Sequence, residues 1–242
     1  TAYKHFDVEN SWNFDDEIPN EKWQNVTLPH DYIIRQKPDP ERGSPTGFVN
    51  CHNAWYRKNF KLSPEMRGKR ITLLFGAVSG NSAIYLNGCL IKYNHCAYTP
   101  IEADITDYVR FDCENVVAVY IDMSLIEGWW YRGAGIYSHA KLIVTDKLCV
   151  DLYGDYVRPV FDCSKWKLDI TTTVRNDEYD DAEVKLIHHI FDNDGNECAL
   201  YETAGNVGAR SLCDISFSGT FGNPKLWDID SPVLYTLFTE VV

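Results

Sequence analysis

The chain has 242 residues, 45% of them hydrophobic and 14% aromatic, which is enough to bury a sizeable core in one large or two ordinary domains. Its 35 acidic and 23 basic residues give a formal net charge of −12, which repels phosphate backbones and anionic lipids. We therefore expect neither nucleic acid nor a membrane among its partners, and no apolar run approaches the roughly 20 residues that cross a bilayer.

Short β-branched and aromatic runs, separated by turn residues, predict strands along most of the chain. Asn87-Gly88 lies between two such runs, and this pair predicts a hairpin because both central residues of a type I′ turn need positive φ. No stretch shows a sustained 3.6-residue apolar period, and residues 101–109 are expected to form at most a helical turn. The runs with strand character are 71–75, 82–86, 116–121, 141–144, 167–174, 184–191 and 234–242.

The polar segment 145–147 separates two parts of plausible domain size, so we place a boundary between residues 145 and 146. The second part alternates strands and turns like a small immunoglobulin-like sandwich. Residues 192–197 are predicted to form a hairpin turn, because their Gly falls fourth and not sixth as a calcium loop requires. His188 and His189 are neighbours on a predicted strand, so they should point to opposite faces and not chelate one metal ion.

Eight cysteines are scattered along the chain without a CxxC pair or a zinc-like spacing. A chain of this size needs no disulfide staples, so we predict free thiols and, from them, a cytoplasmic location. The cysteines are Cys51, Cys89, Cys96, Cys113, Cys149, Cys163, Cys198 and Cys213.

Several segments, in chain order, resemble the N-terminal half of glycoside hydrolase family 2. Residues 130–137, Trp-Tyr-Arg-Gly-Ala-Gly-Ile-Tyr, resemble the family's W-Y-x-G-x-G-I-Y signature, which is the most specific of the matches. Residues 54–60 resemble its W-Y-R-K-x-F strand. The other similar segments are 23–32 (W-x-x-V-x-L-P-H-D-W), 75–88 (F-x-G-V followed by V-Y-x-N-G), 98–107 (Y-T-P-F-x-x-D-I-T-D), 114–119 (E-N-x-x-A-V) and 226–235 (L-W-x-x-x-x-P-x-L-Y).

The resemblance implies an all-β chain, with a galactose-binding-like jelly-roll sugar-binding domain over residues 1–145 and an immunoglobulin-like β-sandwich over residues 146–242. It also implies that the parent protein is a retaining exo-glycosidase, most like a β-galactosidase. In this family the catalytic glutamates lie on a following barrel, which this chain lacks, so we assign no catalytic residue and expect the chain alone to be inactive. A β-glucuronidase or β-mannosidase of the same family, or a free-standing carbohydrate-binding module, remain open alternatives.

Four residues are candidates for contact with sugar. By resemblance, Glu127 occupies an acidic position in the loop before the signature, where some β-galactosidases bind sugar hydroxyls and a sodium ion, although a capping or solvated Glu is equally expected. Trp129 offers a ring that stacks on a pyranose or fills a core, and it stands where the family often has Arg, which leaves the choice of sugar open. Asn50 and His52, in the turn-rich segment before residue 54, carry amide and imidazole groups that bind either sugar hydroxyls or water.

Other polar groups have ordinary structural interpretations. His30-Asp31 looks like half of a catalytic triad, but its counterpart in the family is structural and the chain has no nucleophile elbow. Glu41, Glu102, Asp104 and Asp107 are interpreted as solvated surface carboxylates. We expect no cofactor in this chain, with sodium or magnesium an expectation only for the full-length enzyme. The expected partners are a β-linked carbohydrate, the catalytic barrel of the same protein, and further copies in a homo-oligomer.

Overall fold

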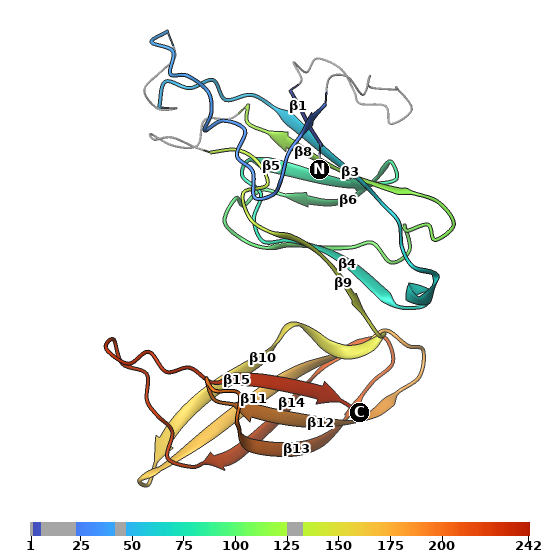
Figure 1. The fold of residues 1–242 in the computed structure, drawn as a ribbon. Coiled ribbons are helices and arrows are strands. Elements are labelled where there is room, and N and C mark those ends of the chain that lie inside the picture. Colours follow the sequence, from blue (N-terminus) through green and yellow to red (C-terminus); the bar gives the residue numbers. More distant parts are fainter. Residues whose placement is uncertain (1, 6–22, 42–46, 125–132) are drawn as a thin grey trace. The chain divides into compact units, whose positions relative to one another are not determined.

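The computed structural model describes residues 2–5, 23–41, 47–124 and 133–242 (Figure 1). It divides the chain into two compact units, Thr1–Val144 and Thr145–Val242. Strands dominate both units, and the one helical element among the described residues is a short 3₁₀ turn, Pro64–Met66. Each unit is described by itself.

The first unit is a β-sandwich of a six-stranded and a three-stranded sheet (Figure 1). The larger sheet has the order β2-β1-β3-β8-β5-β6 and is antiparallel throughout, and the smaller has the order β7-β4-β9. The strands are β1 (Ala2–His5), β2 (Gln24–Asn25), β3 (Ala54–Phe60), β4 (Arg70–Phe75), β5 (Asn81–Leu86), β6 (Cys89–Asn94), β7 (Ile101–Asp104), β8 (Asn115–Asp122) and β9 (Ala140–Thr145).

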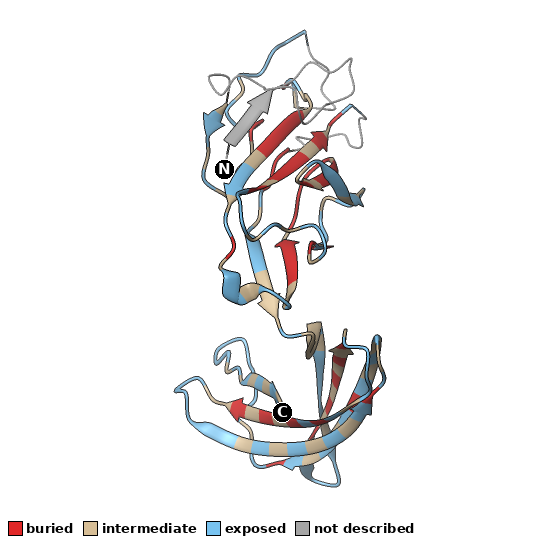
Figure 2. Cartoon of the chain, turned by 90° about the vertical axis from the view of Figure 1, so that its right-hand side faces the viewer, coloured by how far each residue is buried: buried red, intermediate tan, exposed pale blue. Residues whose placement is uncertain are grey.

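Aliphatic side chains from both sheets form the core of this unit. Ile71, Ile84 and Ile121 are fully buried, and Ile136 joins them from the segment before β9. Figure 2 shows the buried residues concentrated along the strands. Removal of each such side chain from water contributes about 1.5–3 kcal/mol, so this core is the main stabilising force of the sandwich.

The predicted hairpin is confirmed. β5 and β6 are joined by Asn87 and Gly88, whose φ angles of 51° and 90° are both positive. The expectation of a helical turn at residues 101–109 is wrong for its first half, because Ile101–Asp104 forms β7. In that strand Ile101 and Ala103 are buried while Asp104 is exposed, a period of two that a run of only four residues shows weakly.

The second unit contains two three-stranded sheets, of order β10-β11-β14 and β13-β12-β15 (Figure 1). Leu168, Ile170 and Val174 of β11 and Leu186 of β12 point inward at alternate positions. The strands are β10 (Leu148–Asp162), β11 (Lys165–Asn176), β12 (Ala182–Phe191), β13 (Glu197–Val207), β14 (Ser211–Phe221) and β15 (Thr236–Val241). The all-β class, with a jelly-roll sandwich followed by an immunoglobulin-like sandwich, is confirmed.

Three further predictions from the sequence agree with the structure. Residues 192–197 form the turn between β12 and β13, with the Asp192 carboxylate accepting the backbone N–H of Asp194 and of Asn196 at 2.9 Å each. His188 is fully buried, whereas Nδ1 of His189 lies 2.6 Å from a carboxylate oxygen of the half-exposed Glu197. All eight cysteines are free thiols. In the described part of the chain no helix is long and apolar enough to cross a membrane.

The burial of His188 makes the stability of the second unit depend on pH. Burial lowers the pKa of His188 below its ordinary value of 6.5, because the charged imidazolium loses its hydration, while Asp155 opposes this shift. The unfolded chain therefore binds the proton more readily, and stability is lost as pH falls from about 6.5 toward the lowered folded pKa. We expect the urea midpoint of His188→Leu to fall less between pH 7.5 and pH 5.5 than that of the unaltered chain.

Circular dichroism at the two pH values measures these midpoints, and His139→Gln, at an exposed position of the first unit, is the matched control. Between pH 7.5 and pH 5.5, the urea midpoint of the second unit should fall as much in the control as in the unaltered chain. Equal losses in the unaltered chain and in His188→Leu would contradict the assignment to His188.

Candidate functional site

The segment that leads into residues 125–132 is fixed by the side chain of Asn53. Oδ1 of Asn53 accepts the backbone N–H of Met123 at 2.7 Å, and its Nδ2 donates to the hydroxyl of Tyr120 at 2.9 Å. The next backbone N–H, that of Ser124, donates to the Asp122 carboxylate at 2.8 Å. The chain therefore leaves β8 in a defined direction.

The segment that follows residues 125–132 is held by Ser79 and Gly135. The two residues form an antiparallel bridge, in which the nitrogen of Ser79 lies 2.9 Å from the oxygen of Gly135 and the nitrogen of Gly135 lies 3.5 Å from the oxygen of Ser79. The Ser79 hydroxyl also donates to the carbonyl oxygen of Gly133. Gly135 has a φ of 142°, and a Cβ at this position would overlap the carbonyl oxygen of His30. Only glycine fits this close approach of two backbone segments.

Asp31 joins this exit segment to the segment after the cis Leu28-Pro29 bond. Its Oδ1 accepts the backbone N–H groups of Ile33 at 2.8 Å, Ile34 at 3.2 Å and Ala134 at 3.3 Å. The N–H of Tyr32 donates to the carbonyl of Ala134 at 3.0 Å. A carboxylate with several backbone donors is strongly fixed, so Asp31 serves here as a structural acceptor.

His30 is bound to the hydroxyl of Tyr56, with its Nδ1 2.7 Å from the phenolic oxygen. Burial lowers the pKa of His30, and the positive charge of Arg35 lowers it further, while Asp31 opposes both. The neutral imidazole is thus favoured near pH 7. Together with the contacts of Asp31, this geometry gives His30-Asp31 the role of a joint between segments.

Asn50 and His52 lie on the segment that ends at Asn53. Nδ1 of His52 lies 3.2 Å from the amide nitrogen of Gln36 and 3.3 Å from the carbonyl oxygen of Asn50. The Tyr32 hydroxyl donates to the carbonyl of His52 at 2.6 Å, and the two rings lie 5.0 Å apart. His52 is therefore half-buried and fixed, whereas the side chain of Asn50 is exposed.

The structure brings residues 50–53 to the entry of residues 125–132, and residues 30–34 to the exit. Glu127 and Trp129 themselves lie outside the described residues, as does the first part of the W-Y-x-G-x-G-I-Y signature. We call the segments 30–36, 50–53, 122–124 and 133–136 the loop frame. The Ser79 side chain completes the loop frame. Sequence reasoning missed this residue, because the only signal there is the turn pair Ser79-Gly80.

Aromatic side chains next to the loop frame pack together on the larger sheet. The ring of Trp55 lies 4.8 Å from that of Tyr120 and 5.6 Å from that of Tyr85. Burial raises the pKa of both tyrosines. Trp55 retains only 5% of its surface, so its face is occupied by packing and does not form a free stacking platform.

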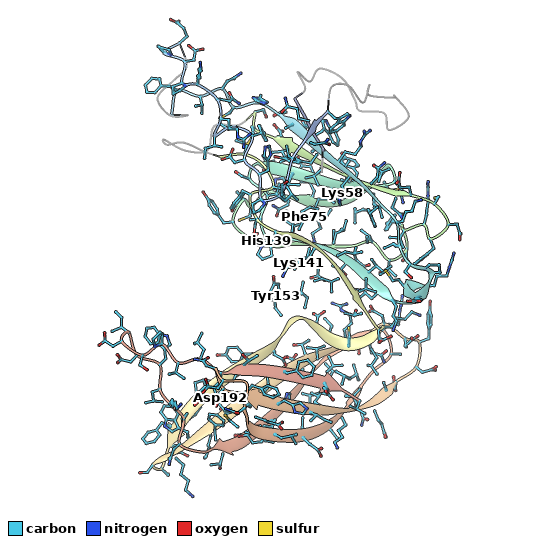
Figure 3. All side chains as sticks on the ribbon, in the orientation of Figure 1. Lys58, Phe75, His139, Lys141, Tyr153 and Asp192 are labelled. Carbon is cyan, nitrogen blue, oxygen red and sulfur yellow. The ribbon has the colours of Figure 1, made fainter. Side chains whose placement is uncertain are left out.

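A cavity of about 230 Å³ opens between the two sheets of the first unit, but its lining does not suit a sugar. Leu73, Phe75 and Val119 are among the apolar groups that line it, with Lys58 and Lys141 also at its border; Figure 3 labels Phe75 and both lysines. Recognition of a carbohydrate needs several converging hydrogen-bond donors and acceptors. The surface exposed inside this cavity is mostly apolar, and its polar side chains, Tyr56, Arg57, Lys58, Lys61 and Lys141, include no carboxylate or amide. Among the described residues, no cluster of three His, Cys, Asp or Glu is placed to hold a metal ion.

Residues 7–145 match the model of the sugar-binding domain of glycosyl hydrolases family 2, and residues 155–242 match a second model of the same family. The chain belongs to glycosyl hydrolase family 2. The resemblance carried by the motifs is thereby confirmed, and the two matches follow each other in the order of the two sandwiches.

The relatives of this family 2 chain are much longer than the chain itself. The β-galactosidase BoGH2A of Bacteroides ovatus is 32% identical over 224 residues, which cover 91% of this chain and 26% of the relative. A β-galactosidase of Thermoanaerobacter pseudethanolicus is 28% identical and aligns with 100% of this chain and 31% of its own length. The crystal structure of a family 2 member from Bacteroides cellulosilyticus superimposes with a TM-score of 0.88 at 27% identity, over 100% of this chain and 32% of that one.

Asn53 provides a test of the loop frame. Replacement Asn53→Ala removes the acceptor of the Met123 N–H and the donor to Tyr120, and unsatisfied polar groups in such positions cost about 1–3 kcal/mol. We expect a loss of this size in the free energy of unfolding of the first unit, measured by urea denaturation. Asn50→Ala, at an exposed position three residues away, should change it by less than about 0.5 kcal/mol.

Proposed function

We propose that this chain is the non-catalytic part of a retaining β-glycosidase, with β-galactosides as its first substrate class. The observation that carries the proposal is the coverage: 91% of the chain aligns with BoGH2A, yet the alignment takes up only 26% of that enzyme. In this interpretation the chain forms one wall of the sugar pocket and a scaffold for a catalytic barrel elsewhere in the same polypeptide.

Three of the described carboxylates make structural contacts that do not suit catalysis. Hydrolysis with retention needs two carboxyl groups about 5.5 Å apart, on opposite sides of the scissile bond. Glu102 and Asp104 instead share one cation, with Arg70 nitrogens at 3.6 and 2.6 Å from their oxygens. Asp31 is fixed by backbone donors. These groups stabilise the fold.

The loop frame supports the assignment of a pocket wall. A sugar hydroxyl is recognised well only when its partner is held in place before binding, since ordering a free loop costs part of the interaction energy. Hydrogen bonds from Asn53 fix the entry of residues 125–132, and the Ser79–Gly135 bridge fixes the exit. Glu127, between these two anchors, is proposed to accept hydrogen bonds from the sugar.

Two other functions compete with this proposal. A β-glucuronidase of Formosa agariphila is 25% identical over 90% of this chain, so β-glucuronides are the second substrate class to test, with β-mannosides after them. A free-standing carbohydrate-binding module is the candidate from another class. Such a module would bind free galactose tightly enough for calorimetry, whereas a detached pocket wall would not.

The first test is hydrolysis of chromogenic β-galactoside, β-glucuronide and β-mannoside. We expect no turnover by the 242-residue chain, because the proposal places the catalytic pair outside it, and turnover of one substrate by the longer polypeptide that the proposal requires. Turnover by the 242-residue chain that persists after repurification and disappears with a carboxylate-to-amide substitution would contradict the proposal.

A second test addresses Glu127 in the longer polypeptide. A hydrogen bond to a charged acceptor contributes about 1.5–3 kcal/mol, so Glu127→Gln should lower kcat/KM on the preferred substrate by about 10- to 100-fold. Glu41→Gln, at an exposed position, is the matched control and should leave kcat/KM unchanged. Equal kcat/KM for both variants would remove Glu127 from the pocket.

A further inference from the structure

The second unit has an apolar cleft between the edges of its two sheets. The cleft encloses about 330 Å³ and is lined by Val157 and Pro159 of β10, Leu237 of β15, and Leu226, Trp227 and Leu234 of the connection between β14 and β15. Leu226, Trp227 and Leu234 retain 58%, 61% and 63% of their surface. Large side chains that remain so exposed in one place mark an interaction surface.

The sheet topology explains why the sandwich is open at this side. β10 and β15 lie at the edges of their sheets, each hydrogen-bonded to one neighbouring strand, β11 and β12 respectively. At the opposite edges a tight turn joins β13 directly to β14. The β10–β15 side therefore exposes both apolar side chains and backbone edges, which proteins normally cover.

The connection that carries Trp227 is ordered by its own contacts. Asp228 and Ser231 exchange two backbone hydrogen bonds, at 3.0 and 3.1 Å, directly after Trp227. The backbone N–H of Lys225 donates to the Tyr235 hydroxyl at 3.0 Å, and the Tyr235 ring packs edge-on against Phe221. The apolar groups are thus presented on a fixed turn, which lowers the entropic cost of docking.

The composition of the cleft suits a protein surface better than a small polar ligand. Lys225 is the one charged residue among the described groups that line it. Asp228 and Asp230 stand beside the apolar groups on the same turn. An aromatic and aliphatic centre with charges at its rim is typical of protein–protein interface cores.

We propose that this cleft, with Trp227 as its central anchor, is the docking surface for the catalytic domain of the same polypeptide. This inference rests on the proposed function, which supplies that domain. The length of relatives identifies this occupant. BoGH2A and the Thermoanaerobacter enzyme align with 91% and 100% of this chain, and in each the sequence outside the alignment is about two to three times as long as the aligned part. A domain on the same polypeptide also has a high effective concentration at the cleft.

Hydroxyl-radical footprinting tests the occupant. The oxidation rates of Leu226, Trp227 and Leu234 are measured in the 242-residue chain and in the longer polypeptide. We expect these rates to be at least about fivefold lower in the longer polypeptide, because a docked surface excludes water. Leu212 is 51% exposed and pairs with Arg175 at the far end of β11, so its rate should be equal in both proteins.

Three outcomes would overturn the proposal. Equal rates in the two proteins would mean that the cleft stays open. If these three residues are protected in the 242-residue chain and the protection grows with its concentration, a second copy of the chain is the occupant. If they are protected there at every concentration, the occupant is the chain's own first unit. Glycosidase activity is assayed separately, so an inactive polypeptide with a protected Trp227 contradicts the proposed function and leaves the docking surface standing.

A pair of variants gives an independent readout. Trp227→Ser should leave the urea midpoint of the 242-residue chain unchanged, since Trp227 is largely exposed there, but should speed thermal inactivation of the longer polypeptide several-fold. Leu212→Ser should affect neither. Equal inactivation rates for the two variants would also overturn the proposal.

Discussion

The close backbone approach between residues 30–34 and residues 133–136 is the constraint on which the candidate site depends. Asp31 supplies a carboxylate oxygen for three backbone donors, and Gly135 supplies the space in which the two segments meet. Ser79 then ties the same segment to the turn after β4. These contacts hold the segment after residues 125–132 and the Asn53 contacts hold the segment before them, so both flanking segments are held by residues from other parts of the chain.

Much of the fold follows from local chemistry that a single sequence displays. Asn87-Gly88 suits positive φ at two adjacent positions, and Asp192 suits a turn because its carboxylate caps two backbone N–H groups. β10 was not predicted from the sequence, since it contains Gly154, Pro159 and several charges. Cross-strand partners compensate, as in the 2.7 Å pair of Arg158 with Asp169 of β11. Such pairs depend on register, which periodicity alone does not reveal.

The candidate site was only partly predictable for a related reason. Asn50 and His52 could be proposed because turn formers surround polar groups there, and a strand follows. The sequence does not show that Asn53 binds the backbone 70 residues away, or that Ser79 meets Gly133 across 54 residues. These contacts arise from sandwich topology, so a motif can mark the segment but not the side chain that holds it.

The loop frame also separates architecture from specificity. Its hydrogen bonds involve backbone groups and the side chains of Asp31, Asn53 and Ser79, all of which lie outside residues 125–132. The described contacts that hold the loop frame therefore do not depend on the side chains at 125–129, which precede the family signature. Exchange of these five residues with those of a relative is therefore a direct way to seek a new sugar preference while those contacts are retained.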